Sequence, residues 1–406
     1  MLVAAIAFAC PAGAVETSIL LSPTPAANAE MGYAVALDGT QIAIGAAGEN
    51  ANAGAMYTVD CSTWPCGAPL RIAPADIVAN DEFGAAVSAS GDTLVATAPG
   101  PEPGAAYVFV RDGSGWSQQA RLTPTGGSAG ERFGISVSLS GDRLAVGADR
   151  ADSGRGAVYV FVRAGTAWTQ EARLTAADSA LRDALGSSVA LDADSLLAGA
   201  PIKRNGTVGS YANGAAYIFT RGAGGWTQQA KLTPSSSING DVFGYAVALD
   251  GDRAVVGAPY ASLAQGYAYV FTRVGSAWSQ QAQLAASGGA AGDEFGWSVA
   301  LGDNTVLVGA PFTGQLAEAA CGGSYIFDAA SLTETGTGSV EAPLLNEMAG
   351  WSIAASGARW VGGAPGHVVG TDVHAGAVYW FDPMITLFHS GFDVNGACVA
   401  TEKPGG

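Results

Sequence analysis

The chain has 406 residues, of which 49% are hydrophobic and 13% charged, so it can bury a large core and lacks the composition of a disordered protein. It carries 18 Lys and Arg against 35 Asp and Glu, a net charge of -17, which argues against nucleic acid and anionic membrane surfaces as partners. The chain has 58 glycines and shows no pattern of long amphipathic helices, which predicts short strands joined by tight turns.

The first residues form the apolar stretch MLVAAIAFACPAGAVETS, in which Ala12 and Ala14 stand at the spacing that signal peptidase recognises. We expect a secretory signal peptide over residues 1–14 and a protein that is secreted, periplasmic or at the cell surface. A lipoprotein anchor at Cys10 is the alternative, although Phe8 is bulky for that motif. No later apolar run is long enough to span a bilayer, so an integral membrane protein is not expected.

Four cysteines would remain after cleavage behind Ala14, and an even number in an exported protein indicates disulfide bonds. Cys61 and Cys66 flank a short turn and are expected to pair with each other. Cys321 and Cys398 are then left as a second pair or as two buried free thiols.

A unit of about 50 residues recurs seven times along the chain. Each copy has an anchor glycine, usually within the dipeptide FG, at Gly32, Gly84, Gly134, Gly186, Gly244, Gly296 and Gly350. Thirteen residues after each anchor comes a second element, usually GAP, which begins at Gly45, Thr97, Gly147, Gly199, Gly257, Gly309 and Gly363. A Gly three residues before a Tyr follows in every copy, and four copies continue with W-[ST]-Q-x-A-x-L from Trp116, Trp168, Trp226 and Trp278.

Each copy therefore holds up to four runs of strand length, which in the fifth copy read FGYAVAL, RAVVGAP, GYAYVFTR and WSQQAQL. One such sheet cannot bury both of its faces, but seven packed radially can. The repeat thus predicts an all-β, seven-bladed β-propeller of four-stranded antiparallel blades. The seventh copy lacks its last run, and an unpaired run over residues 17–23 precedes the first copy, so we expect this N-terminal segment to close the ring as an outer strand. The propeller would span residues 15–382, followed by a tail over 383–406.

The FG and GAP elements in constant register resemble the FG-GAP repeats of the integrin α-subunit propeller and its bacterial relatives, over roughly residues 15–382. The resemblance implies ligand binding at the face that carries the loops between units and the loops between second and third strands. It also implies Ca²⁺ in the loops between first and second strands, but here those loops are tight hairpin turns. Only two carboxylate pairs remain in them, so we expect no tight Ca²⁺ site and no other cofactor; the weak candidates are Asp192, Asp194, Asp250 and Asp252.

Catalytic patterns are sparse. The sequence GGSAG at residues 126–130 matches the G-x-S-x-G motif of serine hydrolases, but it lies in a polar loop with no helix after it. His367, Asp372 and His374 share one loop and could hold zinc, although their spacing matches no known zinc motif. An acidic residue stands two positions before the FG phenylalanine in six copies, and we expect it to accept backbone hydrogen bonds in a turn rather than to bind a cation.

Two features of the ligand-binding face differ between the units. The loops between second and third strands are longest in units four, six and seven, and they carry Lys203, Arg204, Tyr211, Phe312, His367 and His374. The residue after the anchor glycine is aromatic in four units that become neighbours when the ring closes: Tyr33, Tyr245, Trp297 and Trp351. These rings either pack between blades or form an aromatic crescent at the channel mouth, where they could anchor a partner.

The leading hypothesis is a secreted or surface-exposed, non-catalytic binding or adhesion propeller that engages a protein or glycan ligand through this face. The first alternative is a lectin-like propeller whose carbohydrate pockets recur with the blades. The second is a secreted hydrolase or lyase that uses the ring as a scaffold. No motif specifies an oligomeric state.

Overall fold

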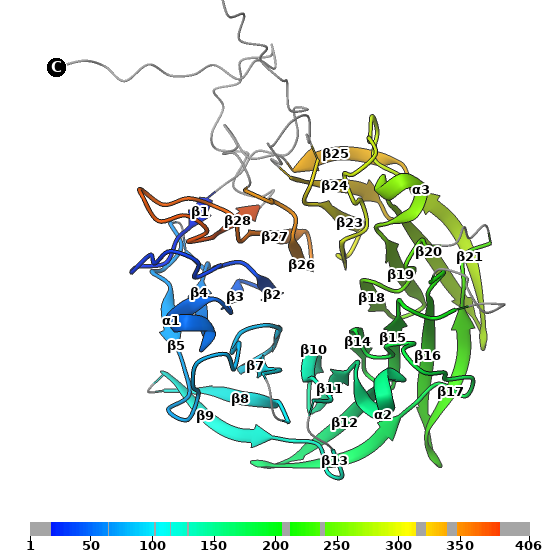
Figure 1. Ribbon diagram of the computed structural model, residues 1–406, viewed down its shortest axis with the longest axis horizontal. Coiled ribbons are helices and arrows are strands. Elements are labelled where there is room, and N and C mark those ends of the chain that lie inside the picture. The colour runs from blue at the N-terminus through cyan, green and yellow to red at the C-terminus, as the bar shows by residue number, and fades with distance from the viewer. Residues whose placement is uncertain are drawn as a thin grey trace, which may run out of the picture.

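The computed structural model describes residues 18–63, 65–100, 103–113, 115–127, 130–204, 212–235, 240–313, 322–338 and 347–381. These residues form seven four-stranded antiparallel sheets arranged in a ring (Figure 1), which confirms the expected propeller. The predicted signal peptide, the tail over 383–406, Tyr211, Cys321 and Cys398 lie outside the described residues. No helix in the described ranges is long and apolar enough to cross a membrane.

Each blade runs from an inner strand beside the central axis to an outer strand at the circumference. The inner strands are β2 (Ala34–Asp38), β6 (Val87–Ser90), β10 (Phe133–Ser140), β14 (Ser188–Asp192), β18 (Val247–Asp250), β22 (Ser298–Leu301) and β26 (Ser352–Ser356). The second strands are β3 (Gln41–Ala46), β7 (Thr93–Ala98), β11 (Arg143–Ala148), β15 (Ser195–Ala200), β19 (Arg253–Ala258), β23 (Thr305–Ala310) and β27 (Arg359–Ala364).

The third strands are β4 (Ala55–Asp60), β8 (Ala105–Asp112), β12 (Ala157–Ala164), β16 (Ala215–Gly222), β20 (Tyr267–Val274), β24 (Gly323–Asp328) and β28 (Ala377–Phe381). The outer strands are β5 (Leu70–Ile72), β9 (Gly115–Leu122), β13 (Ala167–Leu174), β17 (Gly225–Leu232), β21 (Ala277–Leu284), β25 (Glu334–Gly338) and β1 (Ser18–Leu20). Three short helical turns join second to third strands in units one, three and five: α1 (Glu49–Asn52), α2 (Ala151–Gly154) and α3 (Ala261–Ala264).

The N-terminal strand closes the ring, as the sequence predicted. β1 lies beside β28 (blue and red in Figure 1) and pairs with it antiparallel, with Ser18 opposite Trp380 and Leu20 opposite Val378. The seventh sheet therefore has the order β1-β28-β27-β26, in which the two ends of the described chain lie in one blade. Leu20 is buried in the core between the seventh and first blades.

The two glycines of the repeat meet across the interface between neighbouring blades. A Cβ added at Gly199 in the GAP element would overlap with the backbone oxygen of Gly244, the next anchor glycine. Gly244 itself has a φ of +94°, which residues with a side chain rarely adopt. The FG-GAP pattern thus records where the backbones of adjacent blades come into contact. The phenylalanine of FG is fully buried, and Phe243 packs edge-to-face on Tyr269 with the ring centroids 5.5 Å apart.

The W-[ST]-Q motif fastens the outer strands to one another. The indole Nε1 of Trp168 donates a hydrogen bond to Gln119 Oε1 of the preceding blade, at 2.9 Å. The same outer strand also accepts a hydrogen bond from the preceding blade: the backbone N–H of Thr125 donates to Gln170 Oε1, at 2.8 Å. The sixth blade forms its outer strand β25 without this motif, and there Glu334 accepts a bond from the backbone N–H of Ser287, at 2.9 Å.

The recurrent acidic residue before FG is structural in three of its copies. The carboxylates of Asp81, Asp183 and Asp293 each accept a hydrogen bond from the backbone N–H three residues earlier, at 2.8, 2.6 and 2.7 Å. These bonds shape the turn that enters the inner strand, which confirms the expected turn role at these positions.

Candidate partner-binding site at the channel mouth

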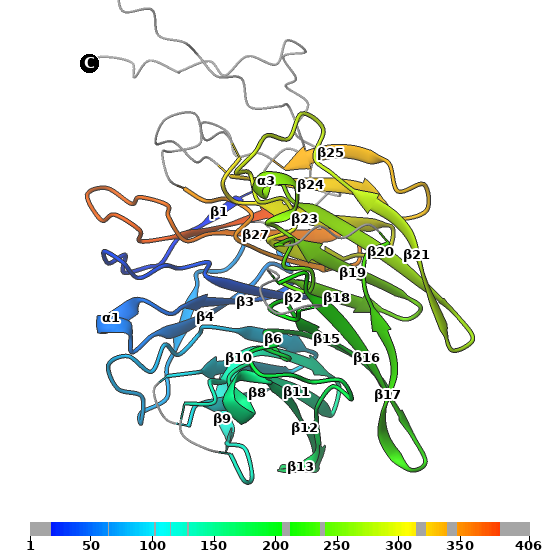
Figure 2. The same cartoon turned by 45° about the vertical axis from the view of Figure 1, so that its right-hand side comes forward.

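The alternating strand directions divide the connections between two rims. The loops between units and the loops from second to third strands share one rim, here termed the loop rim, while the tight hairpin turns share the opposite turn rim. At the loop rim the backbone N–H of Glu294 donates to the carbonyl of Ala264 at the end of α3, at 2.9 Å. Figure 2 shows the β20–β21 hairpin projecting away from α3, at the other end of the fifth blade.

Four aromatic rings from four units meet at the loop rim and form the aromatic crescent, defined as Tyr33, Trp351, Trp297 and Tyr245. The ring centroids of Tyr33 and Trp351 lie 5.9 Å apart, and Trp297 lies 4.7 Å from both Trp351 and Tyr245. Each ring is half-buried, and ring closure makes the first unit a neighbour of the seventh. The residues after the anchor glycines are therefore in contact around half of the ring.

Two further rings extend the crescent outward. Phe312, which the sequence had singled out, lies 5.6 Å from Trp297 and 6.3 Å from Trp351. Tyr260, which is not among the residues expected from the sequence, lies 6.4 Å from Tyr245. Both follow the proline of a GAP element, so this repeat position was the signal that could have identified Tyr260.

The crescent borders one side of a cavity of about 270 Å³ at the mouth of the central channel, which all seven inner segments line. The opposite side carries the smaller residues Ala85, Ile135 and Ser187. Deeper serines of the lining are already bonded: their hydroxyls donate to carbonyl oxygens of the neighbouring blades at 2.8–3.0 Å, and they are Ser136, Ser188, Ser298 and Ser352.

Three glutamates lie beside the crescent, and each stands two residues before an anchor glycine: Glu30, Glu82 and Glu294. Glu294 Oε2 is buried without a hydrogen-bond partner in the described structure, and burial raises the pKa of this carboxyl to about 7. Burial and then the charges of Glu30 and Glu82 raise the pKa of Tyr33. Burial is the main cause of the raised pKa of Tyr245. The nearby groups Tyr260, Tyr33 and Glu294 raise it further. No sequence motif marks these glutamates as functional.

Exposed apolar side chains concentrate on the same rim. Among the described residues, six exposed large apolar side chains lie in loops of the loop rim: Val78, Leu181, Ile202, Tyr260, Leu263 and Val373. Leu263 in α3 is 87% exposed. On the turn rim, the exposed apolar side chain is that of Val274, the last residue of β20. The loop rim is therefore the more apolar of the two rims.

The structure corrects the expectation that Lys203 contacts a partner. Its side chain is 5% exposed, and Nζ donates to Asp183 Oδ2 at 2.7 Å and to the carbonyl oxygen of Asp178. Although burial raises the pKa of Asp178, hydrogen bonds from Lys231 and Tyr217 and the charge of Lys203 lower it to about 2. Lys203 is thus enclosed in an ion-pair network below the rim, whereas the neighbouring Arg204 is exposed.

The two histidines of the seventh unit differ in environment. His367 Nδ1 lies 2.8 Å from Glu347 Oε1 and 3.3 Å from the hydroxyl of Tyr379, and its side chain is 13% exposed. His374 is exposed on the loop rim, where its carbonyl accepts a hydrogen bond from the backbone N–H of Glu30, at 2.9 Å. In the described ranges, no group of three or more His, Cys, Asp or Glu side chains is placed to hold a metal ion. Ser128 of the GGSAG sequence lies outside those ranges.

The weak Ca²⁺ candidates lie on the turn rim, and three of them have structural partners. Asp192 Oδ2 accepts a hydrogen bond from the backbone N–H of Gly251 in the next hairpin, at 2.7 Å. Asp252 pairs with Arg273 at 2.6 Å, and Asp194 pairs with Arg143 at 3.1 Å; Asp250 is exposed. That this chain has no tight Ca²⁺ site remains a prediction.

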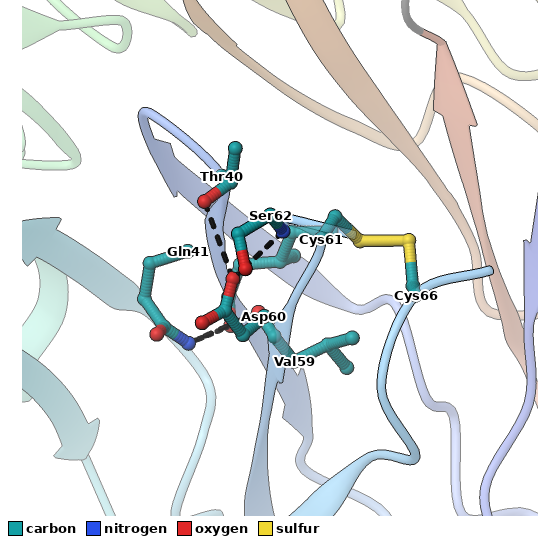
Figure 3. The surroundings of a disulfide bond; sticks show 8 residues. Thr40, Gln41, Val59, Asp60, Cys61, Ser62 and Cys66 are labelled. Carbon is teal, nitrogen blue, oxygen red and sulfur yellow. Dashed lines mark hydrogen bonds between the residues drawn. A yellow bond between two sulfur atoms is a disulfide. The ribbon is translucent and has the colours of Figure 1, made fainter. Parts of the chain in front are cut away.

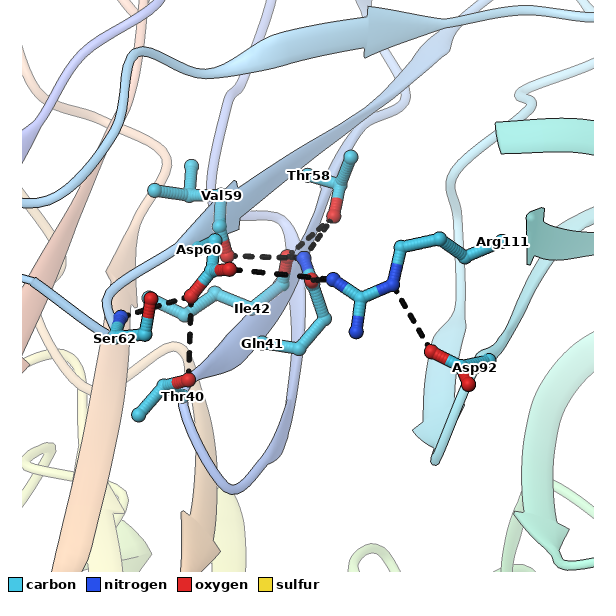
Figure 4. Close-up of polar contacts among 9 residues, drawn as sticks. All are labelled: Thr40, Gln41, Ile42, Thr58, Val59, Asp60, Ser62, Asp92 and Arg111. Atoms are coloured by element: carbon cyan, nitrogen blue, oxygen red, sulfur yellow. Dashed lines mark hydrogen bonds and ion pairs between the residues drawn. The ribbon is translucent and has the colours of Figure 1, made fainter. Parts of the chain in front are cut away.

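A second cavity, of about 320 Å³, lies on the turn rim between the first two blades. Arg111 crosses it, with Nε 3.0 Å from Asp92 and Nη1 3.2 Å from Gln41 and 4.0 Å from Asp60 (Figure 4). The predicted disulfide between Cys61 and Cys66 is present directly after Asp60 (Figure 3) and fixes the end of β4. The charged groups of this cavity already bind one another, which leaves the channel mouth as the stronger candidate site.

Comparisons with known proteins agree with the fold. The family model described as FG-GAP repeat matches residues 70–109, 116–161, 168–219, 226–271 and 278–327, together more than half of the chain. No curated protein matches the chain by sequence. A chain in the crystal structure of the Mitotic Checkpoint Complex is 12% identical, with a TM-score of 0.57 over 94% of this chain and 99% of that chain. Sqt1 of Saccharomyces cerevisiae is 8% identical, with a TM-score of 0.51 over 91% of this chain and 99% of that chain.

Identities this low show a shared propeller fold and no more. The constant register of the repeats and the five matched segments are specific to one kind of propeller. The chain therefore belongs to the FG-GAP repeat family.

Proposed function

We propose that the protein is an exported, non-catalytic interaction or adhesion module that binds a protein partner through the loop rim, with the aromatic crescent at the centre of the contact. The observation that carries this proposal is the continuous contact of Tyr33, Trp351, Trp297 and Tyr245 at the channel mouth. Half-buried aromatic anchors surrounded by polar loops are typical of binding hot spots. The exposed apolar residues on the same rim add to this surface, and such patches mark interaction sites.

The position of the crescent supports one asymmetric contact. The aromatic residues belong to units five, six, seven and one, while the equivalent positions in units two to four hold Ala85, Ile135 and Ser187. A lectin-like propeller with one pocket per blade would need its aromatic residues to recur around the ring. We therefore favour a protein partner over glycans, and a glycan array is the measurement that distinguishes them. Saturable glycan binding that Trp297→Ala leaves unchanged would favour the lectin-like alternative.

Export is part of this proposal. The apolar N-terminal stretch with its signal-peptidase spacing supports it, and so does the disulfide between Cys61 and Cys66, because such bonds persist in oxidising compartments. Mass spectrometry of the protein from its native source should find a mature N-terminus at Val15 and Cys61 linked to Cys66. A protein that retains residues 1–14 and reduced cysteines would contradict export.

Affinity capture from the native extracellular or surface fraction tests the binding role. We expect the intact protein to retain a partner that the double variant Trp297→Ala with Tyr260→Ala loses. The control is Val274→Ala, which removes an exposed apolar side chain from the turn rim and should retain the partner. All three proteins are first compared by thermal melting, so that unfolding does not imitate loss of binding. If the crescent variant and the control capture the same partners in equal amounts, the proposed surface is wrong.

A further inference from the structure

We propose that the channel mouth binds a methylated ammonium group, as found in choline or in trimethylated lysine, against the curved face of the aromatic crescent. This inference rests on the proposed function, because it names the chemistry that the same surface recognises. It draws on the shape of the aromatic wall, the charge beside it and the hydrogen-bonding groups of the cavity.

The wall is curved rather than flat. Trp297 is flanked by Tyr245 and Trp351, whose ring planes are inclined to it by 46° and 49°. Phe312, which does not line the cavity, supports Trp297 almost perpendicularly at 85°. Successive tilts of this kind wrap around a rounded group, whereas a pyranose ring stacks on a flat, open aromatic face. Aromatic faces attract cations through their quadrupole, Trp most strongly, and groups of them bind quaternary ammonium ligands.

The charge beside the wall favours a cation. Within the described parts of the chain, Glu30, Glu82 and Glu294 form no ion pair, and one oxygen of Glu294 is buried without a hydrogen bond. Burial is the main cause of the raised pKa of Tyr33 and Tyr245, and nearby carboxylates add to it at both rings. At Tyr33 the charge of Arg132, which pairs with Asp149, acts in the opposite direction. The whole chain carries a net charge of -17, so its long-range field also attracts cations.

The hydrogen-bonding groups select among cations. The serine hydroxyls of the cavity lining already donate to carbonyl oxygens, as with Ser298 and Gly350 at 2.8 Å, so they are not free to donate to an anionic ligand. Ring faces accept N–H hydrogen bonds only weakly, so the donors of a primary ammonium or a guanidinium would lack good acceptors where the cation lies against the rings rather than against a glutamate. A trimethylammonium group carries no N–H donors and avoids this cost. The volume of about 270 Å³ lies near the lower end for ligand pockets, which suits a head group better than a large ligand.

Titration calorimetry and tryptophan fluorescence with the full chain test the inference. The probes are choline, free trimethyllysine, guanidinium and 3,3-dimethyl-1-butanol, the neutral counterpart of choline, all at one ionic strength. We expect saturable binding of choline and of trimethyllysine, with affinity for the neutral alcohol and for guanidinium lower by about tenfold or more. Preference for trimethyllysine over choline would identify a protein side chain as the source of the group, and the reverse a free choline-type compound.

A graded set of variants separates a cation site from a merely apolar one. Trp297→Phe should weaken choline binding severalfold, and Trp297→Leu, which keeps an apolar side chain, should weaken it by more than tenfold. Glu294→Gln should weaken binding severalfold through loss of the charge, while Val274→Ala on the turn rim should leave it unchanged. Thermal melting of each variant controls for folding, and Glu294→Gln keeps the test valid if the Trp297 variants are unstable.

Equal affinity for choline and the neutral alcohol would overturn the inference, and so would the absence of saturable binding of either ammonium probe. Crescent-dependent capture of a partner without any ammonium binding would leave the proposed function standing and refute the inference alone. Crescent-dependent ammonium binding without crescent-dependent capture would support the inference and refute the proposed protein contact.

Discussion

Glu294 shows how the position of one residue in the fold changes its chemistry. It has a positive φ of 56°, as do residues at the same repeat position in other units, and this conformation places its carboxyl beside the crescent. Burial, rather than a neighbouring charge, raises the pKa of this group from an ordinary 4.5 to about 7. The carboxylate form is therefore unfavourable in the folded protein unless a cation compensates for it.

The stability of the protein should depend on pH through Glu294. Between pH 4.5 and about 7 the folded state holds a proton that the unfolded state has released, so the free energy of unfolding falls as pH rises through this window. Glu294→Gln removes this contribution. The melting temperature of the variant relative to the unaltered protein should therefore rise from pH 4.5 to pH 7.5 and then level off.

Glu82→Gln is the matched control, because Glu82 occupies the same repeat position with an exposed side chain. Differential scanning fluorimetry compares the two variants over this range, and a trend shared by both would not come from the burial of Glu294. A constant difference for Glu294→Gln would show that burial does not perturb this carboxyl.

The glycine contact between blades gives a second prediction at the scale of single residues. Gly199→Ala should destabilise the protein by about 1–3 kcal/mol or more, because the new methyl group would overlap with the backbone oxygen of Gly244, which cannot move without separating two blades. Gly222→Ala, in the third strand of the same unit, meets no atom within 4 Å and should change stability by no more than about 0.5 kcal/mol. Urea unfolding measures both values. Equal effects at the two positions would mean that the blade contact is not tight.

At the scale of elements, the turns and outer strands link the blades to one another. The first hairpin turn of one blade forms hydrogen bonds with that of the next blade, as when the backbone N–H of Gly91 donates to Asp38 at 2.5 Å. At the circumference, the Trp and Gln side chains of the W-[ST]-Q motif also join neighbouring blades. Polar residues that could have formed ion sites in isolated loops are thus engaged in holding neighbouring blades in register.

Calcium should therefore have little effect on stability. The carboxylate of Asp192 accepts a backbone hydrogen bond from the next blade, and that of Asp252 pairs with Arg273 within its own blade. The turns would lose both contacts if they wrapped a hard cation. The melting temperature in millimolar Ca²⁺ should equal that in EGTA. A calcium-dependent rise that Asp250→Ala abolishes would reveal a site in these turns.

At the scale of the whole molecule, the ring holds together because its two ends share a blade. The strand β1 contributes few residues, yet Leu20 is buried with Val378 and Trp380 in the core that joins the seventh blade to the first. A propeller that is open at one interface exposes two sheet faces to water, so closure should contribute strongly to its stability.

Neighbouring residues of β1 provide a test of closure. Leu20→Ala should cost about 2–5 kcal/mol, because the side chain is 6% exposed in a packed core, whereas Ile19→Ala should cost far less, because Ile19 is 45% exposed. Deletion of residues 15–24 should lower the melting temperature more than either substitution. An unchanged melt after the deletion would show that the ring does not depend on β1.

The sequence by itself determined the propeller, its seven blades and the strand that closes it. The reason is that every unit repeats the anchor glycine, a buried apolar residue directly before it and the second element 13 residues after it, so local pattern and blade packing carry the same information. Only the tertiary structure decided which residues of the loop rim are buried and which are exposed. Chain spacing tells which rim a side chain reaches, but the burial of Lys203 against Asp183 depends on contacts within the folded loop rim. The unpaired carboxyl of Glu294 and the contact of Tyr33 with Trp351 likewise exist only once the ring is closed and packed, because they depend on neighbours distant in the chain.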